Sequence, residues 1–135
     1  MANFLLFHEK GIKDYWDETT GFYTLEAVKV LPDSDRFHLA GESGLPVEIQ
    51  KYLLENGSYR VLCQLAKYSK EPEIIERLSK LDNSFILESL ISNPNTPLEI
   101  LQELSNHRLM VVEVKALKTL CKRYEKLLQD IEAEK

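Results

Sequence analysis

The sequence predicts an all-α fold, namely a short right-handed α-solenoid of three to four helix–turn–helix repeats with an N-terminal cap and a long C-terminal helix. Apolar columns recur every 25 or 26 residues, turn residues separate the two halves of each unit, and the C-terminal segment carries an unbroken helical apolar stripe. The chain of 135 residues, 44% hydrophobic and 29% charged, is long enough to bury one continuous core.

The repeat is defined by five apolar columns. Ile49, Ile74 and Ile100 form the first column, with separations of 25 and 26 residues. The other columns are Leu53, Leu78, Leu104; Val61, Ile86, Val112; Leu65, Leu90, Ala116; and Ala66, Ile91, Leu117. Because residues four apart share one helical face, the first two columns predict one helix per unit, and the last three predict a second helix facing the same core.

Turn and cap residues separate the two helices of each unit. They are Asn56-Gly57-Ser58, Asp82-Asn83-Ser84 and Ser105-Asn106-His107. Thr96 and Glu99 predict a capping box with Pro97 at the first helical position, and Asn93-Pro94-Asn95 ends the preceding helix. We expect a repeat domain over 24–135, with repeats at about 24–44, 45–70, 71–95 and 96–120 and a C-terminal helix to 135.

A fourth unit is expected ahead of the other three. Stepping back 26 residues from the last two columns reaches Leu39 and Ala40. We expect its first helix over 24–31, and the alternative is a strand over 21–31, which is rich in strand-forming residues. Residues 1–23 fit no column and are expected to cap the first unit, as a helix, as a hairpin or partly disordered.

Two stretches of the chain resemble a known helical repeat. Asn93-Pro94-Asn95-Thr96-Pro97-Leu98-Glu99-Ile100-Leu101-Gln102-Glu103-Leu104, and Asp35-Arg36-Phe37-His38-Leu39-Ala40 followed by Pro46-Val47-Glu48-Ile49, resemble the leucine-rich repeat variant family, which is similar in appearance to HEAT and armadillo solenoids. The resemblance covers roughly residues 24–120 and implies paired short helices stacked into a superhelix. It implies no single activity. Some members carry an iron–sulfur module, but this chain lacks the clustered cysteines that such a module requires.

No cofactor, metal or catalytic motif is expected. Cys63 and Cys121 are isolated, and we expect both to be reduced thiols that act as small apolar side chains on helices. The histidines are His8, His38 and His107. His38 with Glu42 would be one His short of a zinc site. With no G-x-S-x-G sequence and no glycine-rich phosphate loop, the sequence predicts a protein that is not an enzyme.

An acidic and aromatic cluster lies near the N-terminus. Asp14, Asp17 and Glu18 stand beside Tyr15 and Trp16. The functional interpretation is a recognition spot, or a carboxylate pair acting as general acid and base. We expect instead that the two aromatic side chains anchor the cap and that the acids face water.

The segment from Leu109 to Lys135 is expected to form one long amphipathic helix. Its apolar residues are Leu117, Leu120, Tyr124, Leu127, Leu128 and Ile131. No further unit covers the last of these, so they pack back on the repeats, bind a partner or form a homodimer. Its basic residues are Lys115, Lys118, Lys122, Arg123 and Lys126. We expect them to form a solvated face, and a nucleic-acid-binding face is the alternative.

These observations together predict a cytoplasmic scaffold or adaptor that binds another protein. The expected contact residues are non-core positions on the second helices and on the C-terminal helix: Tyr59, Arg60, Glu88, Glu113, Lys115, Lys122, Arg123 and Lys126. The net charge of -5 disfavours nucleic acid as the partner. No window approaches the roughly 18 apolar residues of a membrane-spanning helix, and the N-terminal apolar patch is too short for a signal peptide.

Overall fold

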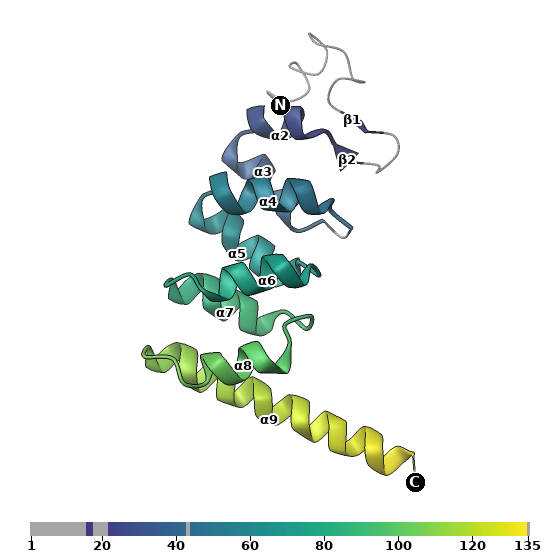
Figure 1. Ribbon diagram of the computed structural model, residues 1–135, viewed down its shortest axis with the longest axis vertical. Coiled ribbons are helices and arrows are strands. Elements are labelled where there is room, and N and C mark those ends of the chain that lie inside the picture. Colours follow the sequence, from purple (N-terminus) through teal and green to yellow (C-terminus); the bar gives the residue numbers. More distant parts are fainter. Residues whose placement is uncertain (1–15, 18–21, 43, 135) are drawn as a thin grey trace.

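The computed structural model describes residues 16–17, 22–42 and 44–134, and this part of the chain is helical apart from one small hairpin (Figure 1). The hairpin pairs β1 (Trp16–Asp17) antiparallel with β2 (Phe22–Tyr23). The helices are α2 (Leu25–Val30), α3 (Asp33–Ala40), α4 (Val47–Asn56), α5 (Tyr59–Tyr68), α6 (Pro72–Ser79), α7 (Ser84–Ser92), α8 (Leu98–Leu104) and α9 (Met110–Ala133). The predicted all-helical class is confirmed, with the hairpin as the departure from it.

The first predicted helix is present as α2, so the strand alternative is wrong beyond the two residues of β2. Thr24 explains its start, because the Thr24 hydroxyl accepts a hydrogen bond from the Ala27 amide at 3.3 Å. Arg36 holds its end, donating to the carbonyl oxygens of Val28 at 3.2 Å and Lys29 at 2.9 Å. The predicted cap over 1–23 lies mostly outside the described residues.

The helices form two layers that alternate along the chain (Figure 1). The first layer contains α2, α4, α6 and α8, each in contact with the next. The second contains α3, α5, α7 and α9, again each in contact with the next. Short turns join the layers, and the apolar side chains between them form one continuous cluster from Val28 to Leu120. Within the described residues, no helix combines the length and apolar composition needed to cross a membrane.

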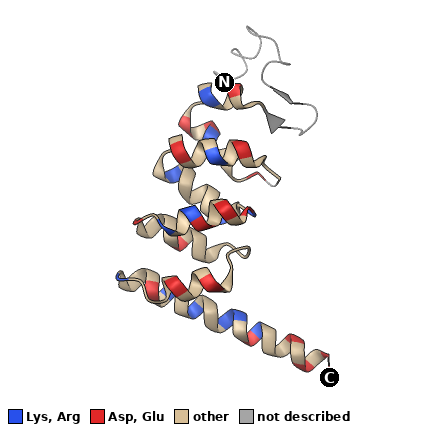
Figure 2. Ribbon diagram, in the orientation of Figure 1, with Lys and Arg blue, Asp and Glu red and all other residues tan. Residues whose placement is uncertain are grey.

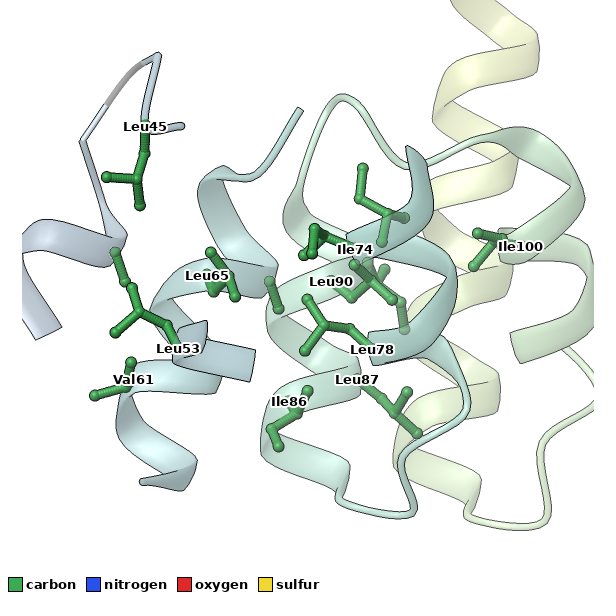
Figure 3. Close-up of a cluster of buried hydrophobic side chains, with 14 of the residues drawn as sticks. Leu45, Leu53, Val61, Leu65, Ile74, Leu78, Ile86, Leu87, Leu90 and Ile100 are labelled. Atoms are coloured by element: carbon green, nitrogen blue, oxygen red, sulfur yellow. The ribbon is translucent and has the colours of Figure 1, made fainter. Parts of the chain in front are cut away.

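The apolar columns of the sequence lie between these layers (Figure 3). Ile49, Ile74 and Ile100 are buried, and each is the third residue of its helix. Leu117 is the exception, because its side chain is 45% exposed. That prediction was wrong: Ala116 takes the inward position on α9, and no described helix lies beyond α9 to cover Leu117.

The predicted turns are confirmed, but the predicted capping box is wrong. The Ser58 hydroxyl caps α5, and the Asn83 side chain caps α7 by accepting from the amides of Phe85 and Ile86. Thr96 is buried, and its hydroxyl donates instead to the Leu90 carbonyl oxygen at 2.6 Å. The N-cap of α8 is Pro97, whose side chain has no hydrogen-bonding group, and the Thr96 hydroxyl is directed at the last turn of α7.

A buried polar network joins the second-layer helices. Asn93, fully buried at the end of α7, donates through its side-chain amide to the carbonyl oxygens of Ala66 at 2.9 Å and Ser69 at 2.8 Å, at the end of α5. The guanidinium of Arg123 on α9 donates to the carbonyl oxygens of Asn93, at 2.9 Å, and Thr96. These bonds satisfy carbonyl groups that helix ends leave without partners, and they connect α5, α7 and α9.

Candidate protein-interaction groove

The second layer carries a shallow groove of about 480 Å³ that crosses α3, α5, α7 and α9. Its lining residues are Phe37, Tyr59, Arg60, Cys63, Lys67, Phe85, Glu88, Ser89, Ser92 and Lys115. Every helix of the layer contributes at least one of them, so the groove exists only when the helices lie side by side. We refer to it below as the second-layer groove.

Aromatic side chains are the main apolar surface of the second-layer groove. Tyr59 and Phe85, in the first turns of α5 and α7, are 57% and 64% exposed. Their ring centroids lie 6.4 Å apart, at an interplanar angle of 43°. Phe37 is half-buried on α3, and the Arg60 guanidinium lies over its ring at 5.2 Å. Aromatic rings held near one another in water offer apolar area that a partner can bury at a small entropic cost.

The charges of the second-layer groove are mainly positive, although the chain as a whole is acidic. Arg60, Lys67 and Lys115 contribute positive charge, and Glu88 contributes the single carboxylate. Within the part of the chain that the structure describes, none of these side chains is engaged in a salt bridge. The groove therefore presents unneutralised positive charge beside aromatic surface, which is complementary to an acidic and apolar ligand.

The structure brings together Tyr59, Arg60, Glu88 and Lys115, which sequence reasoning had proposed as contact residues on separate helices. It also adds Phe85, which that reasoning missed. Phe85 is a non-core residue in the first turn of a second helix, as Tyr59 is, so the rule that selected Tyr59 applies to Phe85 as well.

The other proposed contact residues lie elsewhere on α9. Glu113 is partly buried and does not line the groove, while Lys122 and Lys126 are exposed farther along the helix. Arg123 faces the buried network, and desolvation by burial lowers the pKa of its guanidinium. The side chain of Arg123 therefore stabilises the stack and is not directed at an external ligand.

The cysteines differ in their surroundings. Cys63 is half-buried on α5 in the lining of the groove, where burial raises the pKa of its thiol and a hydrogen bond with Ser89 opposes that shift. Cys121 is exposed on α9, so the expectation that it packs as a small apolar side chain is wrong.

Candidate metal and acid–base groups do not come together in the described residues. In that part of the chain, no group of three His, Cys, Asp or Glu side chains could hold a metal ion. His38 and Glu42 are both exposed. Of the N-terminal acidic and aromatic cluster, only Trp16 and Asp17 fall within the described residues, as β1, and Asp14, Tyr15 and Glu18 lie outside them.

Comparisons with protein-family models, with curated proteins and with solved structures give no match to this chain. The resemblance to the leucine-rich repeat variant family therefore stays a prediction from sequence.

Proposed function

We propose that the chain is a non-enzymatic protein-interaction module, a short right-handed α-solenoid whose second-layer groove binds a segment of a partner protein. The alternating layers and the 25- to 26-residue spacing of the buried columns support the solenoid. The proposed partner is a cytoplasmic protein, and the module acts as a scaffold or adaptor.

One observation carries the proposal, namely that Tyr59 and Phe85 are largely exposed and adjacent in a groove crossed by several helices. Tyr and Arg are enriched among residues that dominate binding energy, and Arg60 lies on the helical turn that carries Tyr59. An exposed aromatic pair adds nothing to the buried core, so the interaction function accounts for its position.

The chemistry of the second-layer groove also defines the partner segment. Apolar side chains of the partner cover the rings of Tyr59 and Phe85, and acidic side chains lie beside Arg60, Lys67 and Lys115. Because Arg60 and Lys67 are exposed, raising the salt concentration weakens binding moderately without abolishing the apolar contribution.

The test is an affinity capture from lysate that compares a groove variant with a matched control. The groove variant carries Tyr59→Ala and Arg60→Ala, and the control carries Tyr68→Ala, a similarly exposed tyrosine on the same helix outside the groove. True partners are retained by the wild-type chain and the control. The amount of each true partner captured by the groove variant falls at least about 30-fold, which corresponds to the loss of about 2 kcal/mol of binding free energy expected for a binding hot spot. Equal retention on all three chains would contradict the placement of the site.

A further inference from the structure

The outer face of α9 carries a heptad pattern that lies apart from the second-layer groove. Its residues follow alternating steps of four and three: Met110, Val114, Leu117, Cys121, Tyr124, Leu128 and Ile131. All of them are exposed, Met110 at 76% and Leu128 at 63%. This spacing is that of the a and d positions of a coiled coil, which pack against a second helix. We call these residues the heptad face.

The C-terminal part of α9 extends past the rest of the molecule (Figure 1). Two side chains attach the middle of α9 to the body: the Arg123 guanidinium, and the Tyr124 hydroxyl, which accepts a hydrogen bond from the Gln102 side-chain amide at 2.9 Å. From Glu125 to Glu134 every residue is exposed. A helical segment of this length is marginal in water without tertiary contacts, so a second helix on the heptad face would stabilise it.

The charges of α9 indicate what that second helix is. Between Met110 and Tyr124 the helix carries four basic residues and one acid: Lys115, Lys118, Lys122, Arg123 and Glu113. From Glu125 to Glu134 it carries four acids and one base: Glu125, Asp130, Glu132, Glu134 and Lys126 (Figure 2). A parallel copy would place like charges beside one another. An antiparallel copy places the basic half of each helix beside the acidic end of the other, which is electrostatically favourable.

We propose that the heptad face pairs antiparallel with the heptad face of a second copy of this chain. In the register that matches a with d positions, Leu117 lies opposite Leu128 of the second copy, and Val114 opposite Ile131. Leu117 and Tyr124 are d positions, and Lys118 and Glu125 directly follow them. Lys118 of each copy therefore lies beside Glu125 of the other copy, which gives two such pairs in the dimer. The dimer carries two second-layer grooves, and the pairing does not depend on what those grooves bind.

The first test is the mass of the full chain in solution by light scattering. At tens of micromolar we expect a dimer, twice the 15.6 kDa of one chain. Leu128→Glu places a charge in the heptad face. We expect it to raise the dissociation constant of the dimer at least tenfold and to give a monomer. Gln129→Glu adds the same charge one residue away, off the heptad face, and is expected to stay dimeric. Far-UV circular dichroism checks that both variants keep their helices. A monomeric wild-type chain, or a dimer that tolerates Leu128→Glu, would overturn the proposal.

The orientation is tested by crosslinking in a background with Cys63→Ser and Cys121→Ser. Val114→Cys and Ile131→Cys are placed on separate chains, which are mixed and treated with a short thiol crosslinker. Antiparallel pairing predicts a product that contains one chain of each kind, identified by its mass. Crosslinking of the Ile131→Cys chain with itself would instead show parallel pairing and refute the antiparallel arrangement.

Discussion

Replacing Asn93 with alanine removes the buried side-chain amide that joins α7 to α5. The side-chain nitrogen of Asn93 donates to the carbonyl oxygens of Ala66 and Ser69, and its backbone oxygen accepts from Arg123. In Asn93→Ala the backbone contact is retained, but both carbonyl groups at the end of α5 lose a donor in a buried setting. Each buried polar group left unsatisfied costs about 1–3 kcal/mol. We therefore expect a loss of about 2–4 kcal/mol in the free energy of unfolding.

Urea denaturation followed by circular dichroism measures this loss, and thermal unfolding gives a second value. With an unfolding entropy of about 2.1 cal/mol/K per residue, a loss of 3 kcal/mol lowers Tm by about 10 °C in a chain of this length. The matched control is Asn106→Ala, because the Asn106 side chain makes one exposed hydrogen bond, to the Gln102 carbonyl oxygen, and should change stability by less than about 0.5 kcal/mol. Equal stability of the two variants would refute the structural role of the Asn93 amide.

Three further predictions follow from the same contacts. A Cβ at Gly57 would lie 2.6 Å from the Leu53 carbonyl oxygen and 2.8 Å from Cγ1 of Val61, so Gly57→Ala should destabilise the chain by about 1–3 kcal/mol in urea titration, and an unchanged midpoint would contradict this packing. Burial raises the pKa of the Cys63 thiol, which lowers its thiolate fraction at neutral pH. Iodoacetamide should therefore label Cys63 more slowly in the folded chain than in urea, as read by mass spectrometry, and equal rates would show that the thiol is freely accessible. A duplex DNA titration at low salt should show no gel shift up to on the order of 10 µM, because α9 is acidic at its end and Arg123 is engaged internally; a steeply salt-dependent shift would contradict this.

Much of the fold could be predicted because the buried columns have helical spacing within each unit and a constant step between units. Ile49, Ile74 and Ile100 could be aligned from sequence because each is the third residue of a first-layer helix and faces the core. The same 26-residue spacing wrongly predicted that Leu117 is buried, because spacing alone does not show whether another helix covers a residue. Among the described residues no helix packs beyond α9, and its inward face is formed by Val112, Ala116 and Leu120.

Local hydrogen-bond choices were less predictable. Thr96 fits a helix-cap pattern, in which its hydroxyl would accept from a backbone amide of α8. Instead, the hydroxyl donates to the Leu90 carbonyl oxygen in the last turn of α7. Asn93 could be predicted as a helix breaker, but its bonds to α5 join residues 24 and 27 positions apart and depend on tertiary packing. Arg123 was grouped with exposed lysines because helical spacing alone does not tell which cation reaches an inward carbonyl.

The candidate site was partly predictable for a related reason. Tyr59, Arg60, Glu88 and Lys115 were selected as side chains that the core did not explain, and the packing of α5, α7 and α9 gathers them. The contribution of Phe37 was not predicted, because it depends on α3 lying beside α5.

The central claim is that helices α3, α5, α7 and α9 together form one binding surface. Amide chemical-shift mapping, with a captured partner segment titrated into the isotope-labelled chain, tests it most directly. The account predicts the largest shifts on all of these helices, around Tyr59, Phe85 and Lys115. Shifts confined to α2, α4, α6 and α8, or to the heptad face, would contradict it.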